Sequence, residues 1–430
     1  MPSLCVRCPH DDDFFESHFV KLRQELDIPA SFPEAVEQEA AEAVRRGPVV
    51  PPGAASSDIA DRRDIDFVTI DPPTSLDLDQ AFASERRGNG YRVFYAIADV
   101  AAFVTPGGAI DAEARARGVT LYSPDINTLL HPAILAENGA SLLAAADRQA
   151  IVWTLDLDSD GKLVGTDVRR ALVRSRAKLS YQEAQDQIDS QTAPESLALL
   201  AEIGRLRQQL ERERGAVSLN LPSQEVVHED DHYRLEYDIS RPIENWNAQI
   251  SLLTGIAAAS LMVGAKVGLL RTLPEPYDRT VKRIRRSALA LGIEWPKAMP
   301  YAERVRDLDP NDPKHAALLN QAARGLRGAG YVGFVGELPE YTRHAAIAAD
   351  YAHVTAPLRR VCDRFANEIV LNISADREPP EWAVSALDEL PSVMGKARSR
   401  DRSLERAVVD LAEAVSLAHR IGHYFPGVVV

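Results

Sequence analysis

The sequence has 430 residues, of which 45% are hydrophobic and 26% charged, as in ordinary globular proteins with one large domain or several. The formal net charge of -14 argues against nonspecific coating of nucleic acids, because affinity for phosphates comes from Lys and Arg, although a basic channel within an acidic protein stays compatible with it. Long uncharged apolar runs and the apolar core of a signal peptide are missing, so we expect a cytoplasmic protein without a membrane segment.

The first segment, residues 1–60, is predicted to be an extension. Residues 19–28 and 33–46 have the pattern of short amphipathic helices, and residues 47–58 read as a linker rich in Pro, Gly and Ser. Cys5, Cys8 and His10 form half of a possible zinc site, whereas a disordered terminus is the simpler interpretation.

The middle of the chain changes from strands to helices near Ser180. Predicted strands cover residues 66–70, 91–100, 151–158 and 162–173, and predicted helices cover 196–215 and 244–264, with a hairpin at 225–238. Strands followed by helices indicate an α+β domain. A long helix is predicted for residues 396–422, followed by a strand in 423–430.

Two basic runs lie in this region, at residues 169–178 and 279–287. A charge run is usually a solvated face of the protein. Contact with phosphate is the alternative for each.

An acidic stretch, "TIDPPTSLDLDQAF" at residues 69–82, contains the candidate site. In an extended segment the side chains of Asp77 and Asp79 lie on the same face. Pro72 and Pro73 keep Asp71 out of a helix. Three converging carboxylates repel one another unless a hard divalent cation compensates them, which favours Mg²⁺ or Mn²⁺ and phosphodiester cleavage. The alternative is an acidic surface turn.

Two other motifs compete with this interpretation. The stretch that begins at Asp156 has the spacing of a calcium-binding loop, but it lies between predicted strands, which favours a β-hairpin turn. "LDLDQ" also resembles a phosphatase motif, in which the first aspartate is a nucleophile, but a loop precedes it where that chemistry needs an apolar strand.

Several segments together resemble the RNB catalytic domain of the ribonuclease II and RNase R family of exoribonucleases. They are residues 69–82, 91–125, 169–185, "RPIENW" at 241–246 and "YAHVTAPLRRVCDRFANEI" at 351–369, and they occur in the family's order. The sequences of these segments are most similar to those of the short actinobacterial and deinococcal members of the family. The resemblance covers about residues 64–375 and implies a mixed β-sheet packed by helices.

The resemblance implies roles for the acidic residues. Asp71, Asp77 and Asp79 match aspartates that bind Mg²⁺, and Asp79 and Asp77 are assigned to catalysis as well. Gln80 stands where the family usually has a fourth aspartate, and it is expected to be a weaker, uncharged metal ligand. Arg359 matches the arginine that stabilises charge on the transferring phosphate; a helix-start ion pair is the alternative for Arg359 or Arg360.

Four residues are expected to contact RNA by the same resemblance. Tyr122 matches an aromatic that stacks on the base at the 3′ end, and Glu244 matches a carboxylate near the ribose. His353 and Arg360 belong to the arginine motif and are expected near phosphate. The alternatives are a core tyrosine, a helix-start acid stabilised by the helix dipole, and a packed histidine.

The chain also departs from the family. Leu219 stands where the family has a second aromatic that clamps the bases. Residues 1–60 are too short to form the cold-shock barrels that precede the family's domain, and residues 423–430 are too short to form the S1 barrel that follows it. We therefore predict an extension at 1–60, an RNB domain at 61–375, and a C-terminal helical segment at 376–430 that ends in an incomplete S1-like strand. Weak RNA affinity and low processivity are expected.

The predicted function is 3′-to-5′ hydrolysis of single-stranded RNA to 5′-nucleoside monophosphates, dependent on Mg²⁺ or Mn²⁺. Single-stranded RNA is the expected partner. An RNB domain that binds RNA or another partner without cutting it is the main alternative, and the metal-dependent phosphatase is the second.

Overall fold

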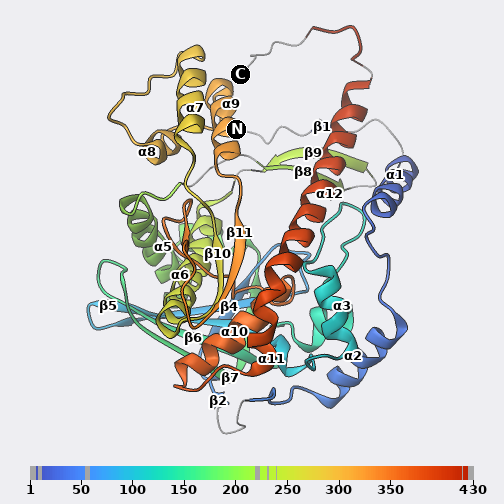
Figure 1. Cartoon of the computed structure of the whole chain (residues 1–430), viewed down its shortest axis with the longest axis vertical. Helices are drawn as coiled ribbons and strands as arrows, with labels where there is room; N and C mark the ends of the chain where they lie inside the picture. Colours follow the sequence, from blue (N-terminus) through green and yellow to red (C-terminus); the bar gives the residue numbers. More distant parts are fainter. Residues whose placement is uncertain are drawn as a thin grey trace.

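The computed structural model describes residues 6–7, 12–53, 59–217, 223–229, 232–238, 240–418 and 420–424. The predictions for Leu219 and for Cys5, Cys8 and His10 lie outside these ranges, as do the last six residues of the strand predicted at 423–430, whose first two residues are described and are not in a strand. Figure 1 shows the whole chain, with the sheet in the lower half and a group of helices above it.

The main sheet contains β2 (Ala60–Asp61), β3 (Phe67–Ile70), β4 (Gln80–Arg87), β5 (Gly90–Ala98), β6 (Asp147–Leu157) and β7 (Leu163–Leu179). Strands β4 to β7 pair in antiparallel succession, whereas β2 and β3 lie parallel to β7. The sheet is therefore mixed, and with the helices around it the fold is α+β, as the sequence predicts.

Strand β7 connects both sides of this sheet. Its first part pairs with β6, and its last part, from Ser175 to Leu179, pairs with β3 with a register shift that leaves out Arg176. Strand β3 in turn pairs with β4 through Val68 and Phe82. The acidic stretch is consequently the β3–β4 connection, and we call residues 71–79 the acidic loop.

The predicted calcium-binding spacing falls on the β6–β7 connection. The Asp158 amide donates to the Lys162 carbonyl at 3.0 Å, and the Asp158 side chain accepts from the amides of Asp160 and Lys162. These bonds close a tight hairpin turn without flanking helices. The hairpin interpretation is confirmed, as is the predicted hairpin of β8 (Ser223–Glu229) and β9 (His232–Asp238).

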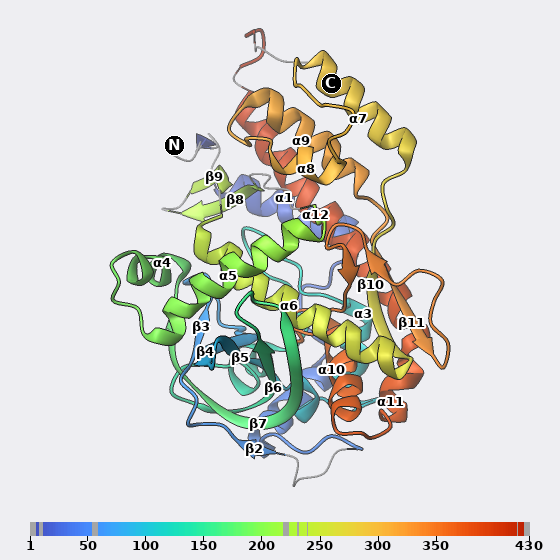
Figure 2. The same cartoon turned by 90° about the vertical axis from the view of Figure 1, so that its left-hand side faces the viewer.

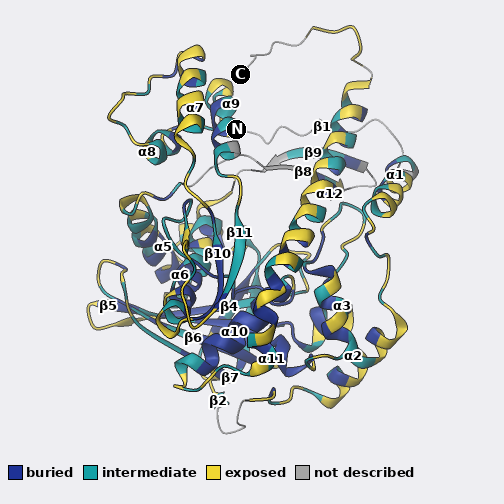
Figure 3. Ribbon diagram, in the orientation of Figure 1, coloured by how far each residue is buried: buried dark blue, intermediate teal, exposed yellow. Residues whose placement is uncertain are grey.

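Helix α6 (Pro242–Ala265) forms the centre of the helical half. It packs against α5 (Glu195–Glu213), α10 (Val361–Ser374) and β10 (Val267–Thr272). Its 24 residues, and the mean hydropathy of 1.6 over its most apolar 18 residues, meet the length and composition of a membrane span, although half of that apolar stretch is buried inside the protein. The apolar composition of α6 is thus explained by its place in the core, as Figure 3 illustrates.

A small helical lobe is inserted between β10 and β11 (Gly330–Val335), which form an antiparallel ribbon. It consists of α7 (Asp278–Ala290), α8 (Tyr301–Arg306) and α9 (Pro313–Gly325), with its own core around Ile284, Leu318 and Leu319. Figures 1 and 2 both show the lobe projecting beyond the sheet. Its outer surface is therefore open to a partner.

The remaining elements cover the edges of the domain. A further core cluster joins α1 (Asp12–Glu25), β9 and α12 (Leu390–Ala418), so the predicted long C-terminal helix is present and packed on the body. The other elements are β1 (Val6–Arg7), α2 (Glu34–Arg46), α3 (Ala109–Arg117), α4 (Tyr181–Asp189), β12 (Arg343–His344), β13 (Ala349–Asp350), α11 (Glu381–Val384), and the short helical turns Val100–Ala102, Leu135–Gly139 and Ser385–Asp388.

Candidate active site

The acidic loop is fixed at its start by strand β7. The Asp71 amide donates to the Leu179 carbonyl at 3.1 Å and so extends the β3–β7 pairing by one residue. The Lys178 ammonium then donates to the carbonyls of Pro73 and Ser75, at 2.6 and 2.5 Å. One ammonium thereby holds two backbone carbonyls of the loop, which has no regular structure of its own.

A buried serine fixes the other half of the loop. The Ser141 hydroxyl donates to the Leu76 carbonyl at 2.6 Å and accepts from the Leu78 amide at 3.0 Å, on either side of Asp77. The Leu142 amide also donates to the Leu78 carbonyl at 3.0 Å. The backbone at Asp77 is therefore held on both sides, while its side chain accepts a hydrogen bond from Tyr122.

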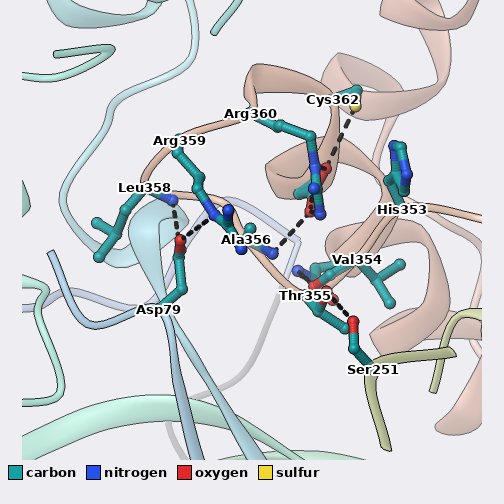
Figure 4. A network of polar contacts seen from close by, with 12 residues as sticks. Asp79, Ser251, His353, Val354, Thr355, Ala356, Leu358, Arg359, Arg360 and Cys362 are labelled. Carbon is teal, nitrogen blue, oxygen red and sulfur yellow. Dashed lines mark hydrogen bonds and ion pairs between the residues drawn. The ribbon is translucent and has the colours of Figure 1, made fainter. Parts of the chain in front are cut away.

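Asp79 is the buried carboxylate of the loop, with 4% of its surface exposed. One carboxylate oxygen accepts from the Leu358 amide at 2.8 Å, and the other lies 3.2 Å from the Arg359 Nε (Figure 4). The Arg359 side chain is 44% exposed, so part of its guanidinium faces solvent. Asp79 thus orients an arginine that remains accessible to a ligand.

We call residues 353–360, which carry Arg359, the arginine loop. Gln80 donates from Nε2 to the Thr355 carbonyl at 2.6 Å and accepts at Oε1 from the Tyr95 hydroxyl at 3.0 Å. Because a carbonyl only accepts, the amide nitrogen of Gln80 must face Thr355. Gln80 therefore connects the start of β4 with the arginine loop, and one lone pair of its oxygen is already used by Tyr95.

Three more polar contacts, from side chains of α10 and α6, hold the arginine loop. The Asn367 amide group donates to the Val354 carbonyl at 2.8 Å, and Asp363 accepts from the Ala356 amide at 2.7 Å. Figure 4 also shows Ser251, whose hydroxyl lies 2.9 Å from the Thr355 hydroxyl. Almost every residue before Arg359 is thus anchored, which limits the positions that its guanidinium can take.

Burial dominates the electrostatics of the acidic loop. Desolvation raises the pKa of Asp71 to about 6 and that of Asp79 to about 8, although the nearby Arg359 lowers both. The pKa of Asp77 is raised for the same reason. The protein alone therefore does not fully compensate these carboxylates, which is the electrostatic condition that a divalent cation satisfies.

The family assignment rests on a comparison of the sequence with models of known protein families. The model of the RNB domain matches residues 59–374, which is well over half of the chain. The chain belongs to the RNB domain family. The expected family is confirmed, and the site described above lies inside the matched region.

Curated relatives agree with the assignment. Ribonuclease R of Escherichia coli is 26% identical over 94% of this chain and 52% of its own length, and a protein of Arabidopsis thaliana named inactive exonuclease DIS3L2 is 30% identical over 70% of this chain and 32% of its own. The chain thus spans about half the length of the E. coli relative and about a third of the A. thaliana relative. RNB nucleases depend in general on metal ions, but the family includes inactive members.

A solved structure shows the same fold. Mycoplasma genitalium RNase R in complex with ribose-methylated single-stranded RNA matches 95% of this chain and 66% of its own, with a TM-score of 0.83 and 19% sequence identity. At this identity the match supports the fold alone.

Within this RNB domain, Asp71, Asp77, Asp79 and Arg359 lie in one region. Their charges appear together among the influences on the pKa values of Asp71 and Asp79. The described residues contain one group of three possible metal ligands within 4.8 Å of one another, and it consists of His353, Cys362 and Asp363. Asp71, Asp77 and Asp79 do not form so tight a group.

The group of His353, Cys362 and Asp363 has the character of a structural cluster. Asp363 already accepts from the Arg360 guanidinium at 2.8 Å and from the Ala356 amide. Burial and the neighbouring Arg360 hold the pKa of His353 well below its usual value, and burial raises that of Cys362 well above. The buried guanidinium of Arg360 beside these atoms disfavours a cation at this cluster.

The structure places two of the predicted RNA contacts in this packed cluster. Arg360 forms an i,i+3 ion pair with Asp363 at the start of α10, which is the alternative considered for it. His353 is bonded to the Tyr331 hydroxyl at 2.7 Å and packs against Tyr351, as a packed histidine does. Both side chains are thus engaged inside the protein, and their contacts with phosphate stay predictions.

Tyr122 and Glu244 lie in different settings. Tyr122 is 50% exposed and donates to Asp77, so its ring borders the acidic loop. Glu244 accepts from the Arg241 amide at 3.0 Å and caps the start of α6, yet its charge also acts on Tyr181 together with that of Asp71. Glu244 therefore has a structural role and still lies near the site.

Sequence analysis missed the residues that hold the site together. Lys178 and Ser141 bind backbone carbonyls of the acidic loop, and Tyr95 bonds to Gln80. Lys178 stands directly before the end of β7, and Tyr95 lies in β5, two residues short of the residue paired with Gln80. An explicit strand register would have brought Tyr95 near Gln80, whereas the contact of Ser141 depends on a loop that has no such register.

Proposed function

We propose that this RNB domain is a metal-dependent exoribonuclease that degrades single-stranded RNA from the 3′ end and releases 5′-nucleoside monophosphates. The observation that carries the proposal is the pair of Asp79 and Arg359, which joins a buried carboxylate to a partly exposed guanidinium beside Asp71 and Asp77. Phosphoryl transfer needs this combination, because charge develops on the phosphate and must be stabilised.

The cation would be held by Asp71, Asp77 and Asp79, with Mg²⁺ or Mn²⁺ as the hard ions that prefer oxygen ligands. The raised pKa values of Asp71 and Asp79 fit this assignment, since carboxyls that burial leaves undercompensated gain most from a cation. When bound, the cation supplies charge neutralisation and lowers the pKa of water. Gln80 stays a predicted ligand, but its amide has a clear structural use of its own.

Arg359 would bind the scissile phosphate through the part of its guanidinium that Asp79 leaves free. An arginine remains charged throughout the reaction and offers several donors to phosphate oxygens. Asp79 contacts Nε, so the terminal nitrogens remain for the substrate. The anchored arginine loop reduces the entropy lost when the phosphate binds.

Tyr122 would stack on the base at the 3′ end, and Glu244 would accept a hydrogen bond from a ribose hydroxyl. An exposed aromatic next to a carboxylate suits a site that accepts any base, because every base has a π-face. A contact with the 2′-hydroxyl distinguishes RNA from DNA. A cytoplasmic location and the division into segments 1–60, 61–375 and 376–430 belong to the same proposal.

The direct test uses 5′-labelled single-stranded RNA with Mg²⁺, an EDTA control and the Asp79→Asn variant. A ladder that shortens from the 3′ end, and that disappears in both controls, is the expected result. Parallel reactions with a blunt duplex and with DNA test the entry and sugar requirements. Intact RNA in the Mg²⁺ lane, under conditions where the protein is folded, would contradict the proposal.

An RNB domain that binds RNA without cutting it is the second candidate. The observation in its favour is Gln80, whose amide is bonded at both ends within the protein. Replacement Gln80→Asp separates the two functions. The active enzyme is expected to lose activity, because the shorter carboxylate leaves the Thr355 carbonyl without its donor; a rise from zero to measurable cleavage favours the binding protein instead.

A further inference from the structure

Helix α7 carries a row of cations on one face. The four residues follow the spacing i, i+3, i+4 and i+7, all are exposed, and we call them the basic stripe: Arg279, Lys282, Arg283 and Arg286. The opposite face of α7 contributes Ile284 and Ala288 to the core of the lobe. The stripe therefore runs for about 10 Å along the outer side of the lobe.

The stripe has no anionic partner among the described residues. None of its four charged groups takes part in an ion pair or a side-chain hydrogen bond there. Arg285, on the same helix, is different, because its guanidinium donates to the carbonyls of Pro296, Lys297 and Met299. The lobe thus uses Arg285 for its own stability, whereas the charged groups of the stripe make no such hydrogen bond within the described residues.

The second basic run of the sequence provides the contrast. In residues 169–178 every cation has a partner inside the protein: Arg169 with Asp167, Arg170 with Asp99 and Glu368, Arg174 with Asp147, Arg176 with Asp66, and Lys178 with backbone carbonyls. This run is structural. In a protein with a net charge of -14, the four cations of the stripe, unpaired within the described part of the chain, are available to an external anion.

The chemistry of the stripe indicates a flexible polyanion. Like charges at i,i+4 destabilise a helix slightly, so their side-by-side placement costs stability that a bound anion recovers. Tyr277, at the start of α7, is 67% exposed, and the Arg279 guanidinium lies 5.2 Å from the centre of its ring. Exposed cations beside an exposed aromatic match the phosphates and bases of single-stranded RNA.

The lobe is joined along the chain to a strand that contacts the arginine loop. Tyr331 is the second residue of β11, directly after the lobe, and its hydroxyl is bonded to His353 at the start of the arginine loop. From Gly325, the last residue of α9, the chain reaches Tyr331 over at most about 20 Å. The lobe therefore connects to the candidate site through β11 and Tyr331.

We propose that the basic stripe of α7 is a second contact for single-stranded RNA, which binds the strand on the 5′ side of the residues held at Asp79 and Arg359. This inference rests on the proposed function for the identity of the polyanion. It predicts that the stripe contributes to the binding of long RNA and leaves the cleavage of short RNA unaffected.

The test is a fourfold variant, Arg279→Gln, Lys282→Gln, Arg283→Gln and Arg286→Gln. Its control is Arg45→Gln, Arg46→Gln, Lys396→Gln and Arg406→Gln, which removes four exposed cations elsewhere and gives the same formal net charge, -14 - 4 = -18. Binding of an RNA of about 30 nucleotides is measured by fluorescence anisotropy in EDTA at several salt concentrations, and cleavage is measured with Mg²⁺ on an RNA of about 5 nucleotides.

We expect the stripe variant to bind the long RNA at least tenfold more weakly than the control, with a salt dependence lower by up to about 3 in the slope of log K against log salt. Cleavage of the short RNA should stay within about twofold of the parent protein. Equal affinity of stripe and control variants would overturn the inference. Because binding needs no metal, a parent that fails to cut the short RNA refutes the proposed function separately.

Discussion

Gln80 donates its side-chain amide to the carbonyl of Thr355 and so links the first residue of β4 to the loop that carries Arg359. The two residues are 275 positions apart in the chain. This bond gives a neutral amide a use at a position where the family resemblance leads one to expect a carboxylate. The amide nitrogen, which an aspartate or glutamate lacks, is the group that makes the bond.

The isosteric variant Gln80→Glu tests this role. It should lower the stability by about 1–3 kcal/mol, because the Thr355 carbonyl loses its donor and faces a carboxylate. Displacement of the arginine loop should also reduce kcat. Urea unfolding and single-turnover cleavage measure both effects. Gln209→Glu is a matched control, since Gln209 is exposed and bonds to Glu213 on the surface of α5; an equal loss of stability in the control would contradict the role of Gln80.

Metal binding should depend on pH in a defined direction. In the metal-free protein the pKa of Asp71 is about 6 and that of Asp79 about 8, so a cation must displace protons below these values. Affinity for Mg²⁺ or Mn²⁺ should therefore fall about tenfold per pH unit below pH 8 and more steeply below pH 6.

The same pKa values determine how stability depends on pH. The native carboxyls hold protons that the unfolded chain releases near the ordinary value of 3.8, so these groups lower stability as pH rises from about 4 to 8. The rise in Tm caused by Mn²⁺ should consequently be larger at pH 8.5 than at pH 6. In Asp79→Asn the dependence above pH 6.5 should flatten; an unchanged profile in this variant would assign the titration to another group.

Lys178 should act as a positioning residue for the acidic loop. The variant Lys178→Met removes both donors to the carbonyls of Pro73 and Ser75, so the loop gains freedom and the metal ligands lose their arrangement. We expect the Mg²⁺ concentration for half-maximal activity to rise about tenfold.

The control for this variant is Lys162→Met, at the exposed turn between β6 and β7, where the lysine pairs with Asp160 alone. Lys178→Arg should recover part of the metal affinity, because a guanidinium also donates to two carbonyls. A purely structural Lys178 would lower Tm and leave the Mg²⁺ requirement unchanged.

A buried ion-pair network between β7 and α10 should contribute more to the free energy of unfolding than the ion pairs on the surface do. Arg170 contacts both Asp99 and Glu368, and Gln149 donates to Asp99 at 2.9 Å. Arg170→Met should cost about 3–5 kcal/mol, because two buried carboxylates lose their partner. Arg174→Met, on the same strand but exposed, should cost no more than about 1 kcal/mol.

The pH dependence of the Arg170→Met variant provides a second readout. Burial raises the pKa of Glu368 to about 7 even with Arg170 present. Without Arg170 the carboxyl should stay protonated to higher pH, so the stability deficit should be smaller at pH 5 than at pH 8. Calorimetry at both pH values measures this; a deficit that grows on acidification would contradict the explanation.

The parts of the site that depend on local order were predictable from sequence. The spacing of Asp77 and Asp79 and the two prolines indicate a carboxylate loop, and the loop lies where the strands on either side require. Asp79 and Arg359 are 280 positions apart, and their place in one site followed from the family resemblance alone, whereas their direct ion pair was not predicted. No pattern within either segment specifies the other.

The supporting contacts could not be predicted for a different reason. Lys178 and Ser141 bind backbone carbonyls, and every residue has a carbonyl, so the sequence gives no sign of which one a lysine or serine will reach. For a similar reason, the sequence could not distinguish the structural role of the first basic run from the exposed position of the second. Both look alike as sequence, and only the carboxylates supplied by neighbouring strands and by α10 show that the first run is neutralised.

The long separation between Asp79 and Arg359 also has a consequence for synthesis of the chain. Asp79 leaves the ribosome about 280 residues before its partner, and a protein elongates at about 5–20 residues per second. For at least about ten seconds the sheet carries a carboxyl whose arginine does not yet exist. The two halves of the candidate site therefore come together only after the arginine loop has been made and docked.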